Sequence, residues 1–303
     1  MAHTKIKGKD FVWWHFSSLE EEDFDTLEKE FKFHPLDFDD LRDDGELAKL
    51  DTYKHYLFSI VTVPVFDTHT KILRKHNVSI FIGKDYVVTV TKKPVDAVER
   101  LFARAGRSSR LRRDALGKTT GYFLYKLLDY IFRDAKVVLR ELVRESEHVE
   151  AQVYDKHTRV TTKRLGILRR NVLQMRQVVE PQRILISQYL NAGKQLIKPN
   201  LEIYFDDVRD TLDGMSVVLE NLKNIVDGLF DVNEAFLSHR TNEIIRLLTI
   251  ISVVLMPPTL ITGYYGMNID SLPFGGNVFI VSGIIVFSII AFWMLISYLD
   301  RRR

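Results

Sequence analysis

The end of the chain carries an uncharged run long enough to cross a lipid bilayer. Residues 278–299 form 22 positions without a charged side chain. At about 1.5 Å per helical residue they would span roughly 33 Å, which matches the hydrocarbon core of a membrane. A second uncharged run, residues 247–265, is less apolar and contains Pro257 and Pro258, which predict a kink or freed carbonyl groups. We predict two transmembrane helices, although a buried or re-entrant segment stays open as an interpretation of residues 247–265.

Charged side chains are concentrated outside these runs. The 303 residues include 43 Lys and Arg and 40 Asp and Glu, but within residues 244–299 the charged side chains are Arg246 and Asp270 alone. The net charge of +3 shows no general basic excess, so we expect no nucleic-acid partner. Because the chain has no cysteine, disulfides and thiolate metal sites are excluded. The composition predicts a charge-rich soluble body joined to a part that contacts membrane lipid.

Arginine residues predict the orientation of the two spans. Arg240 and Arg246 precede the first span, three arginines at 301–303 follow the second, and the connecting loop, residues 266–277, has no Lys or Arg. By the positive-inside rule, both termini lie in the cytoplasm and the short loop lies outside. The first ten residues are polar, so no cleavable signal is predicted.

The first span also carries a stripe of small and polar residues, spaced alternately by three and four positions. This spacing places them on one face of a helix. With its extension toward the amino terminus, the stripe consists of Asp231, Ser238, Asn242, Ile245, Thr249, Ser252, Met256, Thr259 and Gly263. One interpretation is close helix packing, with each hydroxyl bonded to the carbonyl four residues earlier. The other is a water-filled lumen lined by identical helices, and the pattern alone leaves both open.

The residues that close the first span resemble a family signature. Tyr265-Gly266-Met267-Asn268, followed by a short loop and a second span, resembles the CorA family of divalent-cation channels. Other matching segments are Thr241-Asn242-Glu243, residues 248–251, Met256-Pro257 and Thr259 in the span, residues 204–207 and Asp231-Val232 upstream, and His34-Pro35-Leu36 with Asp39-Asp40 near the start. The resemblance touches the whole chain and is strongest from about residue 200 onward.

This resemblance implies a funnel-shaped homopentamer in which the first span of each subunit lines a central pore. It implies an outer selectivity filter formed by Gly266, Met267 and Asn268. Below the filter, the implied pore-lining residues are Thr259, Met256, Ser252, Leu248 and Ile245, with Asn242 and Asp231 as rings on the cytosolic side; Gly263 belongs to the same face. The lumen is therefore the interpretation that the resemblance favours.

The resemblance also implies the ion. Mg²⁺ prefers oxygen ligands and loses its water reluctantly, so a ring of Asn268 amide oxygens suits a hydrated ion. Asp207 matches a position that binds regulatory Mg²⁺ between subunits, and we take Asp96 as its partner. We expect a passive, homopentameric Mg²⁺ channel of the inner membrane, also open to Co²⁺ and Ni²⁺ and closed by intracellular Mg²⁺. We expect neither an enzyme nor an organic cofactor, since no nucleophile, base or nucleotide motif is present.

One departure from the family keeps alternatives open. Phe274 stands where many members carry a glutamate, so Asp270 is the acid that remains in the external loop. The turn Pro273-Phe274-Gly275-Gly276 resembles the related zinc-transporting branch. The first alternative is therefore a zinc transporter, with or without proton coupling. The second is a membrane-tethered coiled-coil scaffold without a pore.

The remaining pattern predicts the domain organisation. Residues 1–115 mix strand and helix signals, including a hairpin at Gly83-Lys84-Asp85, and predict an α/β domain with a largely antiparallel sheet. The basic segment 104–113 is expected to be a loop. The other expected parts are a cytosolic helical hairpin at 116–199, a long stalk and pore helix at 200–265 with its membrane part at about 245–265, the external loop at 266–277, the second span at 278–299 and a basic tail at 300–303.

Overall fold

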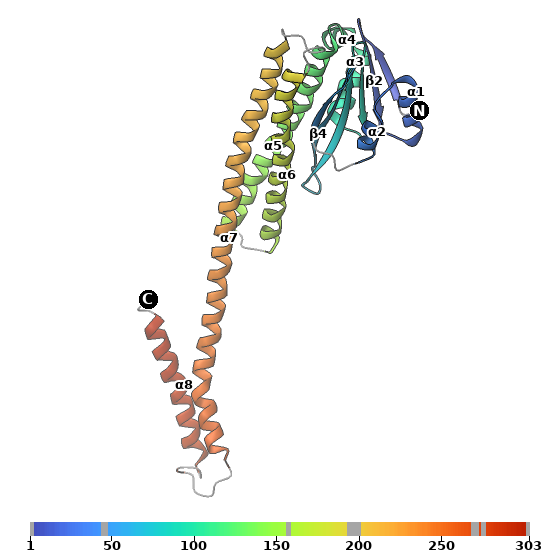
Figure 1. Cartoon of the computed structure of the whole chain (residues 1–303). Coiled ribbons are helices and arrows are strands. Elements are labelled where there is room, and N and C mark those ends of the chain that lie inside the picture. Colours follow the sequence, from blue (N-terminus) through green and yellow to red (C-terminus); the bar gives the residue numbers. More distant parts are fainter. Residues whose placement is uncertain are drawn as a thin grey trace. The chain divides into compact units, whose positions relative to one another are not determined.

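The computed structural model describes residues 3–43, 48–155, 159–192, 201–267, 273 and 277–300. These residues form the strands β1 (His3–Lys7), β2 (Val12–Ser17), β3 (Lys49–Thr52), β4 (Leu57–Asp67), β5 (Ile72–Ile82) and β6 (Tyr86–Thr91). The helices are α1 (Glu21–Glu30), α2 (Pro35–Arg42), α3 (Asp96–Arg107), α4 (Ser109–Leu116), α5 (Thr120–Asp155), α6 (Arg159–Ala192), α7 (Glu202–Tyr265) and α8 (Val278–Asp300) (Figure 1). The chain divides into an amino-terminal unit, Met1–Phe230, and a carboxy-terminal unit, Asp231–Arg303.

The strands of the amino-terminal unit form one mixed sheet in the order β1-β2-β6-β5-β4-β3. Neighbouring strands are antiparallel except for β2 and β6, which are parallel. The predicted hairpin joins β5 to β6, where Ile82 pairs with Val87 and the Gly83 amide donates to the Tyr86 carbonyl at 2.9 Å. The prediction of an α/β domain with a largely antiparallel sheet is confirmed.

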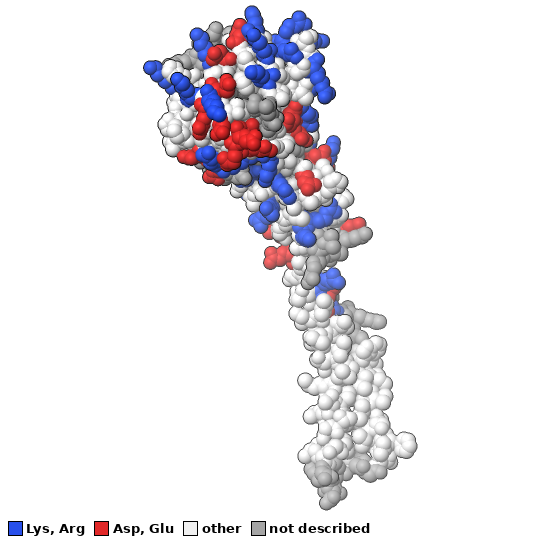
Figure 2. All heavy atoms as spheres, turned by 90° about the vertical axis from the view of Figure 1, so that its right-hand side faces the viewer, with Lys and Arg blue, Asp and Glu red and all other residues white. Residues whose placement is uncertain are grey.

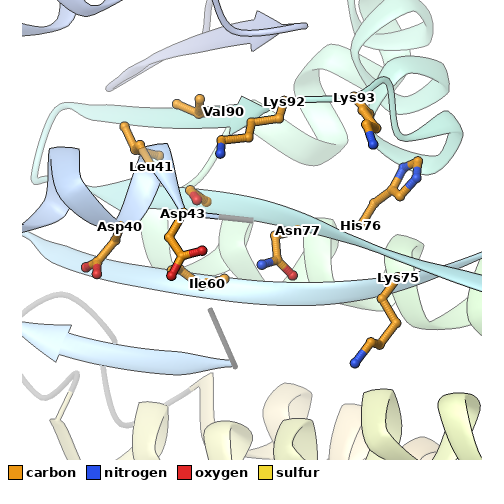
Figure 3. Close-up of a pocket in the computed structure, with 11 residues that line it drawn as sticks. Asp40, Leu41, Asp43, Ile60, Lys75, His76, Asn77, Val90, Lys92 and Lys93 are labelled. Atoms are coloured by element: carbon orange, nitrogen blue, oxygen red, sulfur yellow. The ribbon is translucent and has the colours of Figure 1, made fainter. Parts of the chain in front are cut away.

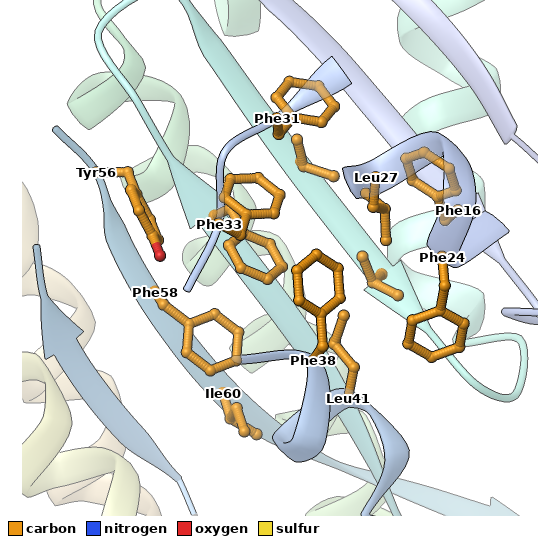
Figure 4. Packing of buried hydrophobic residues seen from close by; sticks show 13 residues of the cluster. Phe16, Phe24, Leu27, Phe31, Phe33, Phe38, Leu41, Tyr56, Phe58 and Ile60 are labelled. Atoms are coloured by element: carbon orange, nitrogen blue, oxygen red, sulfur yellow. The ribbon is translucent and has the colours of Figure 1, made fainter. Parts of the chain in front are cut away.

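An aromatic layer fills the space between one face of the sheet and helices α1 and α2 (Figure 4). Phe33 stacks on Phe81 of β5 with ring centroids 3.9 Å apart, and Phe58 of β4 lies 4.6 Å from the same ring. His34 caps α2 because its Nδ1 accepts from the Leu36 amide at 3.3 Å. The segment between the two short helices is thus held against the sheet by stacked rings and by a helix cap.

The opposite face of the sheet packs against α3, α5 and α6. Trp13 of β2 is fully buried, and its ring lies 4.7 Å from both Phe102 of α3 and Phe123 of α5. Asn171 of α6 accepts a hydrogen bond from the Leu73 amide at 2.9 Å, which ties the helix to β5. Because buried polar groups need partners, this bond fixes where α6 lies along the strand.

The segment 104–113 is helical, so the prediction of a loop there is wrong. Helix α3 continues to Arg107, and α4 begins at Ser109. Ser108 separates the two helices and accepts from the Leu111 amide at 3.3 Å, which caps α4. Arg112 reaches back and donates from its Nε to the Ala105 carbonyl at 3.0 Å, near the end of α3. The basic side chains that suggested a solvated loop therefore include one that caps the preceding helix.

In the amino-terminal unit, helix α6 and the first part of α7 run antiparallel along a heptad seam. The inward residues of α6 are Leu165, Leu168, Val172, Met175, Val179, Gln182, Ile186 and Tyr189, and all are buried. On α7 the matching buried set is Phe205, Val208, Leu212, Met215, Leu219, Leu222, Val226 and Leu229. Both sets alternate spacings of three and four, and the Tyr189 and Phe205 rings meet at 5.9 Å. The seam has the spacing of a coiled coil.

An ionic ladder runs beside this seam. Three arginines of α6, seven positions apart, pair with three acids of α7 that are also seven apart. The pairs are Arg169–Asp227 at 3.2 Å, Arg176–Glu220 at 3.0 Å and Arg183–Asp213 at 2.6 Å. As the residue number rises on α6 it falls on α7, so the ladder confirms the antiparallel register.

The carboxy-terminal unit contains the end of α7 and all of α8. Both helices are long and apolar enough to cross a membrane by length and composition. Pro257 and Pro258 lie inside α7, and the helix continues beyond them to Tyr265. The apolar side chains of this unit are largely exposed: Phe279 is 90% exposed and Leu260 is 75% exposed. Such surfaces are unfavourable in water and favourable in lipid, which fits the predicted pair of transmembrane helices.

Candidate conduction face and acidic sites

The predicted stripe lies on an exposed face of α7. Its residues within the carboxy-terminal unit, Asp231, Ser238, Asn242, Ile245, Thr249, Ser252, Met256, Thr259 and Gly263, are all exposed, and so is Leu248. Met256 is 69% exposed although it lies in the middle of an apolar span. The structure therefore brings the candidate pore-lining residues together on one surface.

The side of α7 opposite the stripe is the covered side. The side chains of Ile250, Val254, Ile261 and Tyr265 are partly buried, and Pro258 is buried. Val254 and Pro258 each follow a stripe residue by two positions, which is about 200° around a helix. Helix α8 is the element of this unit that lies beside the end of α7 (Figure 1). The polar stripe thus faces away from α8.

Hydroxyl groups on the stripe are held by the helix itself. Thr249 donates to the Ile245 carbonyl at 2.8 Å, Ser252 donates to Leu248 at 2.9 Å, and Thr259 donates to Leu255 at 2.8 Å. These are the bonds to the carbonyl four residues earlier that close helix packing predicts. They also use the hydroxyl proton, so the oxygen lone pairs are what each group offers outward. Such a surface accepts hydrogen bonds from water around a cation.

The signature follows directly after α7. The Gly266 amide donates to the Thr262 carbonyl at 2.9 Å, and the Met267 amide donates to the Tyr264 carbonyl at 3.3 Å. A Cβ atom at Gly266 would come within 3.0 Å of the Thr262 oxygen, so glycine suits this close turn at the helix end. Met267 is 51% exposed.

Several predicted residues lie outside the part of the chain that the structure describes. They are Asn268 of the filter, the external acid Asp270, the departure at Phe274 and the terminal arginines. Their roles stay predictions.

The two candidate regulatory acids lie on different elements. Asp207 is exposed on the first turns of α7, and Asp96 is exposed at the first position of α3. Asp207 lies near Tyr125 and Arg133 of α5: burial is the main cause that raises the pKa of Tyr125, and the Asp207 charge adds to it. Neither acid joins a group of three or more metal-ligand side chains among the described residues.

An acidic group that the sequence did not suggest lies at α2 and β3. Carboxylate oxygens of Asp37, Asp40 and Asp51 all lie within 4.8 Å of one another. Asp37 is fully buried and accepts from the Tyr53 hydroxyl at 2.7 Å and from the Tyr56 hydroxyl at 2.6 Å. Burial raises the pKa of Asp37 and outweighs these two bonds, which lower it.

Lys49 supplies the positive charge of that group. Its Nζ lies 2.5 Å from Asp40 and 3.4 Å from Asp51. The ammonium group of Lys49 therefore supplies the cation of this cluster. We interpret the three acids and Lys49 as a structural network. The segment His34-Pro35-Leu36, which carried the weak part of the resemblance, starts the helix that bears Asp37 and Asp40.

Comparison with known proteins decides the family. A family model described as CorA-like Mg²⁺ transporter protein matches residues 8–302. The chain belongs to the CorA family. The resemblance noted from residues 265–268 is thereby confirmed. The family consists of transporters, so this chain is a membrane transport protein and not an enzyme.

Curated relatives agree with this assignment. The cobalt/magnesium transport protein CorA of Thermotoga maritima is 29% identical over 243 residues, which cover 80% of this chain and 68% of the relative. The putative metal ion transporter YfjQ of Bacillus subtilis is 27% identical over 271 residues, which cover 89% of this chain and 82% of the relative.

Solved structures confirm the CorA fold. The complete CorA magnesium transporter of Methanocaldococcus jannaschii aligns with a TM-score of 0.79 at 19% identity, over 96% of this chain and 91% of that one. The cytoplasmic domain of ZntB from Vibrio parahaemolyticus aligns with a TM-score of 0.60 at 11% identity, over 78% of this chain and 89% of that one. At these identities the likeness concerns the fold alone.

Proposed function

We propose that this protein is a passive, homopentameric Mg²⁺ channel of the inner membrane with both termini in the cytoplasm. The first transmembrane part of α7 lines its pore, and α8 lies outside that ring. Co²⁺ and Ni²⁺ are further ions that such a pore would carry. Two curated relatives are named cobalt/magnesium transport proteins, and these names support this choice of ion.

One observation carries the proposal: the polar stripe of α7 faces away from α8. Thr249, Ser252 and Thr259 lie on an exposed face of the part of α7 that is mainly apolar. Polar groups at membrane depth are found against protein or in water-filled cavities rather than against lipid tails. Identical helices arranged around a lumen give the stripe both kinds of neighbour. A tether without a pore accounts for the stripe only if neighbouring helices pack closely against it.

The side chains along the stripe suit a hydrated divalent cation. The hydroxyl oxygens of Ser252 and Thr259 offer lone pairs, because their protons are bonded to the helix. The apolar side chains from Ile245 to Met256 would form a narrow part that closes by excluding water. A ring of Asn268 amides at the outer mouth would attract the cation by its dipoles and still release it, which conduction requires.

Regulation by intracellular Mg²⁺ forms part of the proposal. Asp207 is exposed on α7, and Asp96 is exposed at the start of α3. Mg²⁺ would bridge Asp207 of one subunit to Asp96 of the next and hold the pore closed, because the ion removes the repulsion between the two carboxylates. Asp207→Asn should raise the intracellular Mg²⁺ needed for closure, whereas Asp210→Asn, at another exposed acid of α7, should not.

Zinc transport is the second candidate. Phe274 in place of the expected glutamate favours it, because the turn around this residue resembles the zinc-transporting branch. In this case Zn²⁺ would enter faster than Mg²⁺, and a proton gradient would change the rate if protons are coupled to the ion.

Ion flux into liposomes that contain the purified full chain separates these candidates. Mg²⁺, Co²⁺ and Zn²⁺ are offered in turn, with and without a pH difference across the membrane. We expect Mg²⁺ entry that is independent of the pH difference and is abolished by Asn268→Ala. The matched control, Asn224→Ala on the cytosolic part of α7, should conduct normally. Proton-dependent Zn²⁺ entry without Mg²⁺ entry would contradict the magnesium proposal.

A further inference from the structure

A buried glutamine interrupts the apolar seam between α6 and α7. Gln182 is 0% exposed, and neither its Nε2 nor its Oε1 has a hydrogen-bond partner among the described residues. By its spacing it takes the seam position between Val179 and Ile186, both of which are buried. A buried amide without partners destabilises the arrangement that buries it.

Contacts across the interface show what Gln182 faces. Glu180 accepts from the Ser216 hydroxyl at 2.6 Å, and Arg183 pairs with Asp213 at 2.6 Å. These bonds place Gln182 beside the part of α7 whose inward side chains are Leu212 and Met215, which are buried and apolar. Neither Leu212 nor Met215 has a side-chain nitrogen or oxygen with which the amide could form a hydrogen bond.

The neighbouring turn of α6 is weakened as well. Pro181 lies inside the helix and has no amide hydrogen for the Gln177 carbonyl. Two turns earlier, the buried Oε1 of Gln174 also lacks a partner among the described residues. Two glutamines with unpaired buried atoms and one proline thus fall within nine positions of α6, and of these three residues Gln182 occupies a seam position.

The ion pairs of the ladder partly offset this weakening on the outer side of the same stretch. Arg183 binds both Asp213 and Glu180, and these bonds raise the pKa of the guanidinium. The bond from Ser216 is the main cause that lowers the pKa of Glu180. These polar contacts are partly exposed, so water can replace them at small cost when the helices part.

We propose that the layer around Gln182 is a built-in weak point at which α7 separates from α6 when the pore opens. A buried polar residue in a coiled coil specifies the register of the helices and lowers their stability, so the interface is weakest where that residue lies. The stalk helix that moves there is the same helix, α7, whose far end carries the polar stripe. The gating role rests on the proposed function, whereas the weak layer itself does not.

The test compares Gln182→Met with Gln188→Met in the full chain. Methionine keeps the length of the side chain and removes the amide, and Gln188 is an exposed residue of the same helix. We expect Gln182→Met to slow amide hydrogen exchange about tenfold in residues 178–186 and 208–216. Gln188→Met should leave exchange there unchanged. Unchanged or faster exchange in Gln182→Met would overturn the weak layer.

Two further measurements keep the proposal open to failure. In the unmodified chain, residues 178–186 should exchange faster than residues 165–175 of the same helix, and the reverse order would contradict the weak layer without any variant. In liposomes, Gln182→Met should lower severalfold the intracellular Mg²⁺ that halves flux. Slower exchange with an unchanged Mg²⁺ response would overturn the gating role alone, and absence of any Mg²⁺ flux would count against the proposed function instead.

Discussion

The amino-terminal and carboxy-terminal units treat their apolar side chains in opposite ways. In the first, Trp13, Phe16, Phe58 and Phe81 are fully buried between the sheet and its helices. In the second, Phe279 is 90% exposed, Phe287 is 73% exposed and Trp293 is 60% exposed. The first unit buries its largest apolar side chains within the chain, whereas the second leaves them on a surface that is suited to lipid.

Polar groups show the reverse contrast. Most charged side chains of the amino-terminal unit lie on its surface (Figure 2), and its buried polar groups are mostly bonded, as Asp37, Asn171 and Tyr189 are. The end of α7 displays polar side chains on a face that α8 does not cover. The two units therefore differ in where they place polar side chains as well as in where they place apolar ones.

The largest expected effect comes from truncating the core of the amino-terminal unit. Trp13→Ala removes a buried ring that packs against Phe102 and Phe123 and donates to the Thr89 hydroxyl at 2.9 Å. We expect a loss of about 3–5 kcal/mol in the free energy of unfolding, measured by hydrogen exchange in β2 and β6. Phe279→Ala in detergent is the matched control and should change the stability by less than about 0.5 kcal/mol. Equal losses of unfolding free energy in the two variants would contradict the contrast between the units.

A middle-sized effect should appear as a pH dependence confined to the amino-terminal unit. Asp37 has a raised pKa because it is buried, so the folded state binds its proton more tightly than the unfolded state does. Stability should therefore fall as the pH rises from the ordinary carboxyl value of 3.8 toward the raised value. Asp37→Asn should remove that part of the slope when unfolding is followed between pH 4 and pH 7.

Asp39→Asn serves as the control for that experiment. Asp39 is an exposed acid of the same helix, so its replacement should leave the slope in place. If Asp37→Asn and the unmodified chain showed the same pH dependence, burial of the Asp37 carboxyl would not control it.

The smallest effect should come from the ionic ladder. Arg176 and Glu220 are 38% and 49% exposed at the side chain, so their pair should contribute only about 0.2–1 kcal/mol. Arg176→Gln should lower the denaturation midpoint slightly at low salt and less at high salt. Exchanging the two charges, Arg176→Glu with Glu220→Arg, should restore most of the loss. A larger loss that salt does not reduce would show that packing, and not charge, holds this rung.

The sequence predicted the elements that depend on local pattern. The two uncharged runs, the hairpin at Gly83 and the long helix ending at Tyr265 follow from hydropathy, turn residues and helical spacing. The stripe on α7 was also visible, and the structure adds that α8 lies on the other side.

Features that depend on distant partners were not predictable in this way. The parallel pairing of β2 with β6 joins strands about seventy positions apart, and no local signal marks it. The segment 104–113 is helical because Ser108 and Arg112 cap helix ends. In the sequence, the same serine and arginine look like residues of a solvated loop. The sequence contains the arginines spaced by seven on α6, but it does not show that they pair with the acids of α7.

The central claim, that the stripe on α7 lines a water-filled path for cations, can be tested directly because the chain has no cysteine. Single cysteines at Ser252, on the stripe, and at Val254, on the side toward α8, differ by two positions and lie at about the same membrane depth. Mg²⁺ flux into liposomes is measured before and after a charged, water-soluble thiol reagent. We predict that the reagent blocks flux through Ser252→Cys and leaves Val254→Cys conducting. Block at Val254→Cys with none at Ser252→Cys, or equal response at both, would contradict the account.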